Sequence, residues 1–84
     1  MFNGKVIIIT GGSSGIGKAL AFELGRMGGS IVITGRREKE LFDVAHALQM
    51  EKIKVMAIVS DVSIQSSTNE VVQLTLEKFG RIDV

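Results

Sequence analysis

Three glycines spaced as Gly11-x-x-x-Gly15-x-Gly17 form the pattern in this sequence that points most directly to chemistry. They follow an apolar run at residues 6–9 and precede a segment with helical periodicity. A strand, a glycine-rich turn and a helix in that order make an anion site, because the first N–H groups and the dipole of the helix point out of its N-terminus. Glycines also lack the Cβ atoms that would keep a pyrophosphate away from the backbone. The pattern predicts nucleotide binding; the alternative is a tight turn that serves packing only.

The second pattern with chemical meaning is Gly35-Arg36-Arg37, which follows an apolar run at residues 31–34. In a dinucleotide fold, an acidic residue about 20 residues past the glycines bonds the ribose 2′-hydroxyl of NAD. Gly35 stands at that place here and leaves room for a 2′-phosphate, which a guanidinium can bind through two hydrogen bonds. The pattern favours NADP(H) over NAD(H). The alternative is that both arginines belong to a solvated helix start, although a helix N-terminus is an unfavourable place for cations.

Hydrophobic periodicity predicts three strand–helix units that would position these residues. Strands are expected at residues 5–10, 31–34 and 54–59. Helices are expected from residue 15 to a stop at residues 28 and 29, at residues 37–49, and at residues 65–79. Apolar strand runs of this kind are typical of a parallel sheet that is buried on both faces. We therefore expect an α/β fold, namely the N-terminal half of a Rossmann-type doubly wound parallel sheet, β-α-β-α-β-α plus the start of a fourth strand at residues 81–84.

The same periodicity predicts which side chains of each helix pack on the sheet. For the first helix, the expected apolar stripe is Ile16, Ala19, Leu20, Leu24 and Met27. For the second helix, it is Leu41, Val44, Ala45 and Leu48. For the third helix, it is Val71, Val72 and Phe79, together with either Leu74 or the pair Thr75-Leu76.

Composition argues against several classes of protein. The chain has no Cys and one His, His46, so a disulfide or a thiolate metal site is impossible and we expect no metal centre. A net charge of +1 provides no general attraction to nucleic acid or to acidic membranes. The apolar run near the N-terminus is too short for a signal sequence or a membrane span. We therefore expect neither nucleic acid nor a membrane as a partner, and cytoplasmic location is the default expectation.

Four segments, in this order along the chain, resemble the short-chain dehydrogenase/reductase family. They are the lead-in Gly4-Lys5-Val6, the glycine turn at residues 10–17, Asp61-Val62 after the third apolar run, and residues 79–84. The resemblance covers essentially all 84 residues. It is specific for the family and not for any one of its members.

The resemblance adds two residues to the expected cofactor site. In the family, the residue matching Asp61 bonds the adenine amino group, and the one matching Val62 lines the adenine pocket. The alternative for this turn is a cap on the third helix, made by Asp61 or Ser63. Ser14 is a departure, because some NADP-preferring members carry a basic residue at its position. The cofactor-binding residues expected from pattern and resemblance together are Gly11, Ser13, Ser14, Gly15, Ile16, Gly17, Arg36, Arg37, Asp61 and Val62.

The catalytic residues of the family have no counterpart in this sequence. Family members transfer hydride with a Tyr-x-x-x-Lys pair, a Ser and usually an Asn, and the Tyr acts as general acid/base. The chain has no Tyr, so no catalytic residue is assigned. We interpret residues 1–84 as a partial NADP(H)-binding domain, the N-terminal piece of an oxidoreductase. When complete, this enzyme would interconvert a carbonyl and an alcohol or reduce an enoyl bond.

The expected partners are the dinucleotide and, in the complete protein, a small carbonyl or alcohol substrate and further copies of the same subunit. The alternative function is a non-catalytic nucleotide-binding or interaction module derived from a truncated family member. For residues 1–84 alone, we expect no dehydrogenase or reductase activity. We also expect weak stability, because the first strand would have an apolar edge without a neighbour.

Overall fold

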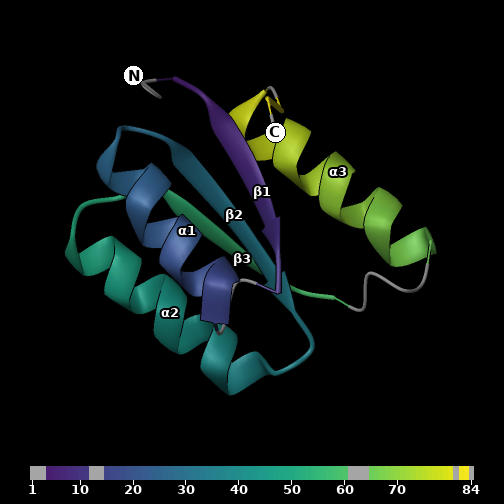
Figure 1. Cartoon of the computed structure of the whole chain (residues 1–84). Coiled ribbons are helices and arrows are strands. Elements are labelled where there is room, and N and C mark those ends of the chain that lie inside the picture. Colours follow the sequence, from purple (N-terminus) through teal and green to yellow (C-terminus); the bar gives the residue numbers. More distant parts are fainter. Residues whose placement is uncertain (1–3, 12–14, 61–64, 81, 84) are drawn as a thin grey trace.

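The computed structural model describes residues 4–11, 15–60, 65–80, 82 and 83. Strands and helices alternate along the chain (Figure 1). Their bounds are β1 Val6–Thr10, α1 Gly15–Arg26, β2 Ser30–Gly35, α2 Glu38–Met50, β3 Val55–Val59 and α3 Gln65–Phe79. The three predicted strand–helix units are confirmed, and each expected element lies within two residues of its observed bounds.

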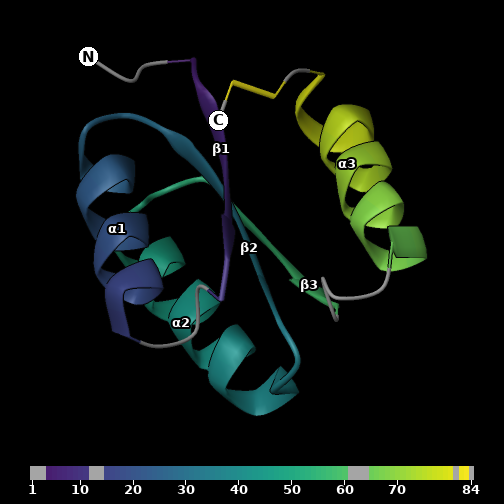
Figure 2. The ribbon, with the colours of Figure 1, turned by 45° about the vertical axis from the view of Figure 1, so that its right-hand side comes forward.

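The strands that the structure describes form one parallel sheet in the order β1-β2-β3. The register pairs Thr10 with Thr34 across β1 and β2, and Thr34 with Ile58 across β2 and β3. Helices α1 and α2 cover one face of the sheet and α3 covers the other, as the two views in Figures 1 and 2 show. The observed architecture is the expected doubly wound parallel arrangement.

The alternation of side chains along each strand divides the core into two apolar clusters. On β2, Ile31 and Ile33 belong to the cluster beneath α1 and α2, and Val32 belongs to the cluster beneath α3. Residues 31–34 are all fully buried. A central parallel strand with helices on both faces has no solvated side, which is why this run contains no charged residue.

The apolar stripe expected on α1 is wrong in its first half. Ile16 is 81% exposed and Leu20 is 44% exposed, and the fully buried positions of this helix are Ala21 and Gly25. The reason is close packing: a Cβ atom on Gly25 would lie only 2.7 Å from Cγ2 of Ile53. The face of α1 that packs on the core is the one with its smallest residues. The spacing of large apolar residues does not reveal such a face, so the prediction failed here.

The other two helices agree better with their expected faces. On α2, all four predicted residues, Leu41, Val44, Ala45 and Leu48, are buried. On α3, Val71 and Thr75 are buried and Leu74 and Phe79 are half-buried. Val72 and Leu76 are exposed, so their expected inward position is wrong. A small buried Thr takes the place next to the sheet, and its hydroxyl donates a hydrogen bond to the backbone oxygen of Val71 at 2.7 Å.

Ile82 and Asp83 run beside the beginning of β1. The backbone N–H of Asp83 donates to the oxygen of Val6, and the N–H of Val6 donates to Oδ2 of Asp83, both at 2.8 Å. Lys5 lies at 4.0 Å from Oδ1 of the same carboxylate. This contact lies where the sequence predicts the start of a fourth strand, on the edge of β1 that faces away from β2.

Candidate functional site

The carboxyl ends of the strands meet at one edge of the sheet, and two backbone hydrogen bonds connect the turns that follow them. The N–H of Gly11 donates to the oxygen of Thr34 at 2.9 Å, and the N–H of Ser60 donates to the oxygen of Gly35 at 2.9 Å. The end of β2 therefore holds the beginning of the glycine turn on one side and the residue after β3 on the other. In open parallel sheets, this edge is where ligands bind.

Two glycines of the turn have backbone conformations that other residues rarely adopt. Gly11 has φ +69° and Gly15 has φ +58°, both in the left-handed region. An added Cβ would meet no atom within 4 Å at either position. The need for glycine here comes from the backbone angle, and the space beside both residues is open to a bound group.

Helix α1 points its N-terminus toward the carboxyl edge of the sheet. Its first turn contains no acidic residue, so no carboxylate of that turn neutralises the positive end of the helix dipole. Gly15, Ile16 and Lys18 are exposed there, and Gly17 is half-buried. An exposed helix start with a nearby lysine suits an anion such as a phosphate.

Arg36 and Arg37 lie in the turn between β2 and α2, at the same edge. Both are exposed, and neither guanidinium makes a hydrogen bond or ion pair with any part of the chain that the structure describes. Arg37 is the N-cap residue of α2, with φ −94° and ψ 99°, and its side chain makes no capping bond. The acidic residues of this helix start are Glu38 and Glu40. Arg36 and Arg37 are therefore free to bind an anion.

The remaining predicted cofactor residues lie outside the described residues. These are Ser13, Ser14, Asp61 and Val62, and the predicted helix cap by Asp61 or Ser63 falls in the same gap. The described residues thus bring together part of the expected set at one sheet edge. They include Gly11, Gly15, Ile16, Gly17, Arg36 and Arg37.

Two hydroxyl groups at this edge were missed by the sequence patterns above. Oγ1 of Thr34 and Oγ of Ser60 are buried, and they have no hydrogen-bond partner among the residues that the structure describes. Strand alternation alone would have placed both side chains on one face. Their lack of partners depends on the packing around them, which no sequence pattern encodes.

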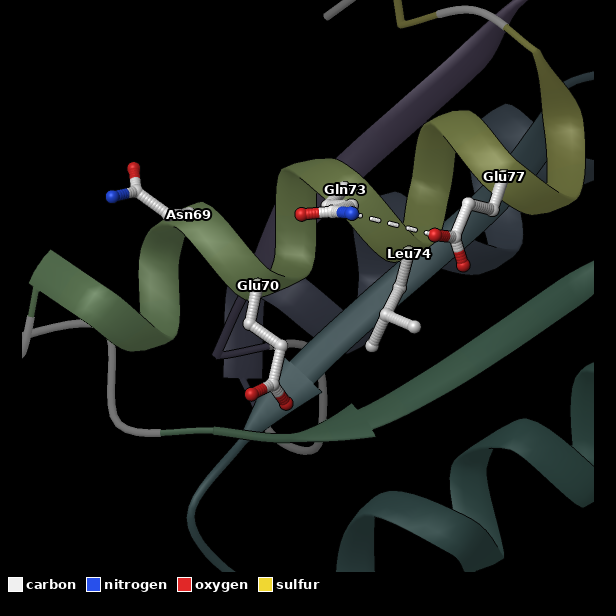
Figure 3. Close-up of a pocket in the computed structure, with 5 residues that line it drawn as sticks. All are labelled: Asn69, Glu70, Gln73, Leu74 and Glu77. Carbon is white, nitrogen blue, oxygen red and sulfur yellow. Dashed lines mark hydrogen bonds between the residues drawn. The ribbon is translucent and has the colours of Figure 1, made fainter.

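Two shallow hollows on the surfaces of α1 and α3 differ in charge. One lies on the outer side of α1 and is lined by Gly15, Lys18, Ala19, Phe22, Glu23 and Arg26. The other follows α3, where Glu70 and Leu74 point to the same side of the helix and the Gln73 amide donates to the Glu77 carboxylate at 3.5 Å (Figure 3). Two carboxylates and no cation line the second hollow, so it repels a phosphate.

Two further findings concern the described residues only. They contain no group of three His, Cys, Asp or Glu side chains that could hold a metal ion. None of the helices among them is long and apolar enough to cross a membrane. His46 is exposed on α2.

Comparison with known proteins identifies relatives of the chain. The family model described as short chain dehydrogenase matches residues 5–84. Tropinone reductase-like 3 of Erythroxylum coca is 36% identical over 83 residues, which cover 99% of this chain and 32% of the relative. The 11-beta-hydroxysteroid dehydrogenase A of Sesamum indicum is 42% identical over 81 residues, which cover 95% of this chain and 23% of the relative.

Solved structures agree with the sequence comparison. A short chain dehydrogenase/reductase from Burkholderia phymatum, in complex with NAD, superposes with a TM-score of 0.94 at 31% identity and covers 96% of this chain and 29% of that one. A metagenomic short-chain oxidoreductase in complex with NADP superposes with a TM-score of 0.91 at 30% identity. The match covers 99% of this chain and 38% of that one. The chain thus spans about a third or less of the length of the two sequence relatives described above. It belongs to the short chain dehydrogenase family, with the parallel sheet and carboxyl-edge glycine turn described above.

Proposed function

We propose that the carboxyl edge of the sheet binds a nicotinamide dinucleotide and prefers NADP(H) to NAD(H). The pyrophosphate would lie against the start of α1, beside Gly11, Gly15 and Gly17, with Ile16 next to it. Ser13, Ser14, Asp61 and Val62 would complete the site. One solved relative contains NAD and another contains NADP, so the family alone does not determine which cofactor binds.

The observation that carries the NADP(H) preference is the pair of unpartnered arginines at Arg36 and Arg37. Elsewhere in the described chain, Arg26 binds both carboxylate oxygens of Glu51, at 2.7 and 2.9 Å. Arg36 and Arg37 have no such carboxylate among the residues that the structure describes, and Gly35 before them presents no side chain that would repel a phosphate. A guanidinium beside the 2′-phosphate would form charge-assisted hydrogen bonds that NAD(H) cannot offer.

We further propose that residues 1–84 form the partial NADP(H)-binding domain of a longer oxidoreductase that interconverts a carbonyl and an alcohol or reduces an enoyl bond. When bound, NADP(H) supplies or accepts the hydride. The part played by this chain's residues is to bind and orient the dinucleotide. The substrate would be a small molecule bound by residues beyond these 84, and the complete protein would be a homo-oligomer in the cytoplasm.

The second candidate function is a non-catalytic nucleotide-binding or interaction module, and the absence of Tyr favours it for residues 1–84 taken alone. An assay of NADPH oxidation with a panel of ketones separates the two. We expect no turnover by residues 1–84 and turnover by the longer protein. Robust turnover by residues 1–84 would contradict the partial-domain interpretation.

The cofactor preference is tested by calorimetric titration of the Arg36→Ala variant with NADPH and NADH. Loss of a charge-assisted contact should weaken NADPH binding by about 1–3 kcal/mol and leave NADH binding nearly unchanged. Lys39→Ala is the matched control, because Lys39 is a nearby exposed cation that already pairs with Asp43 at 3.0 Å. An equal loss for both cofactors would show that Arg36 does not contact the 2′-phosphate.

A further inference from the structure

The end of β2 and the residue after β3 carry two buried hydroxyls on the same face of the sheet. Val32, two residues before Thr34, and Ile58, two residues before Ser60, both belong to the apolar cluster beneath α3. Because side chains alternate along a strand, Thr34 and Ser60 point to that same face. Thr34 is fully buried, and the Oγ atom of Ser60 is shielded from solvent.

A buried hydroxyl without a partner is costly, because it has lost its hydrogen bonds to water and gained none in the protein. The chain avoids this cost at its other fully buried threonine, since Thr75 donates to the backbone oxygen of Val71. Thr34 and Ser60 have no such acceptor among the described residues. One polar group placed between the end of β2 and the residue after β3 would satisfy both hydroxyls.

The register brings the two side chains within reach of one small partner. Thr34 is paired with Ile58, so Ser60 lies one strand across and two residues further on the same face. Strand spacing and rise place their Cα atoms about 8 Å apart. A single water can join two oxygens that lie up to about 5.5 Å apart, so it would reach both hydroxyls if each leaned toward the other along the sheet.

We propose that the hydroxyls of Thr34 and Ser60 share one buried water molecule, and that this link positions the Gly35-Arg36 turn for cofactor binding. The backbone already joins these residues, because the N–H of Ser60 donates to the oxygen of Gly35. The water adds a side-chain connection on the α3 face directly before the turn. It fixes the spacing between the end of β2 and the end of β3. The turn that carries Arg36 begins at this place, so its position is fixed too.

This inference rests on the proposed function, since Arg36 would contact the 2′-phosphate. Thr34 and Ser60 are positioning residues, because they act on the cofactor through the turn. Their effect should therefore appear as a change in the preference for NADPH over NADH, which a purely structural role would not alter.

The test uses the full-length protein that contains this chain and its Thr34→Val, Thr34→Ser, Ser60→Ala and Thr34→Val/Ser60→Ala variants. Calorimetric titration gives the dissociation constants of NADPH and NADH, and thermal melting gives stability. Thr75→Val is the control, because that hydroxyl is buried but bonded within α3.

We expect Thr34→Val and Ser60→Ala each to lower the melting temperature and to weaken NADPH binding about threefold to tenfold, with NADH binding nearly unchanged. Thr34→Ser should restore both properties. The double variant should lose little more than either single variant, because both remove the same water. Thr75→Val should lower stability and leave the NADPH preference intact.

The proposal is overturned if Thr34→Val raises the melting temperature and binds NADPH like the wild type, as expected when an orphaned hydroxyl is replaced by a methyl group. A loss of stability with an unchanged NADPH preference would overturn the positioning role. If the wild type binds neither cofactor, the proposed function fails. A high-resolution crystal structure then decides the water: density between the two hydroxyls supports it, and its absence contradicts it.

Discussion

Glycines at the carboxyl edge of the sheet and glycines in the packed core are required for different physical reasons. Gly11 and Gly15 have positive φ angles and open space where a Cβ would lie. Gly25 and Gly29 are in the opposite situation, since a Cβ would lie 2.7 Å from Ile53 at one position and 3.0 Å from Ile7 at the other. The core glycines allow close packing, whereas the edge glycines leave free space beside the backbone.

The arginines at the carboxyl edge also differ from an arginine far from it. Arg26 at the end of α1 binds Glu51 through two hydrogen bonds and lies 5.2 Å from the centre of the Phe22 ring. Arg36 and Arg37 have no partner within the described chain. This contrast agrees with the proposed dinucleotide site at the carboxyl edge, and mutations can test it.

The largest effect is expected for Gly15→Val at the carboxyl edge. A branched side chain would be strained at φ +58° and would occupy the space proposed for the pyrophosphate. We expect the affinity for NADPH to fall by at least about a hundredfold, or roughly 2.7 kcal/mol. Fluorescence titration of NADPH measures the affinity, and circular dichroism checks that the variant is folded.

Gly25→Ala should give the reverse pattern, because its clash lies in the core. The new Cβ would meet Cγ2 and Cδ1 of Ile53 at 2.7 and 2.8 Å, and Ile53 is buried. We expect the free energy of unfolding to fall by about 1–3 kcal/mol, as measured by urea denaturation, while the folded protein binds NADPH normally.

The Ile53→Ala background provides the control for Gly25→Ala, since it removes both clashing atoms. The cost of the Gly25 substitution should largely disappear in that background. If Gly25→Ala abolished NADPH binding without affecting stability, the division between the two regions would be wrong.

The smallest effect concerns the exposed pair Arg26 and Glu51. The hydrogen bond from Arg26, together with its positive charge, lowers the pKa of the Glu51 carboxyl. Because the folded-state pKa is depressed, the contribution of this pair to stability is present above the unfolded-state pKa of a glutamate and is lost as the pH falls through the folded-state value. The pair is solvent-exposed, so the stability effect should be small.

Carbon-13 NMR titration of the Glu51 carboxyl measures this shift. In the Arg26→Met variant, we expect the pKa of Glu51 to rise toward its ordinary value. An unchanged pKa in that variant would show that the bidentate contact does not persist in solution.

The positions of the elements could be predicted from the sequence because they depend on local periodicity and on glycine stops. The helix expected at residues 65–79 has those bounds, and the inward face of α2 is as expected. The face of α1 could not be predicted, because it depends on how closely Gly25 approaches Ile53, a residue 28 positions later in the chain. Packing of small residues becomes visible only once the sheet and helix are in contact.

The candidate site, like the fold, could be predicted in its arrangement along the chain but not in its packing details. The meeting of the glycine turn and the Gly35-Arg36 turn at one edge follows from parallel strand order, and the two backbone hydrogen bonds at the end of β2 agree with it. The orphaned hydroxyls of Thr34 and Ser60 could not be predicted, since their lack of partners depends on neighbouring strands and α3. Nor could the pairing of Arg26 with Glu51, which are 25 residues apart.

The most direct test of the dinucleotide site is a titration of the nitrogen-15-labelled protein with NADPH, followed through the backbone amide signals of its glycines. We predict large shifts for Gly11, Gly15 and Gly17, and for Gly35 next to the arginines, because their N–H groups lie at the proposed site. The signals of Gly25 and Gly29 should stay in place, since both are buried away from that edge. Shifts confined to the core glycines or to the α3 hollow at Glu70 and Glu77, with the carboxyl-edge glycines unmoved, would contradict the account.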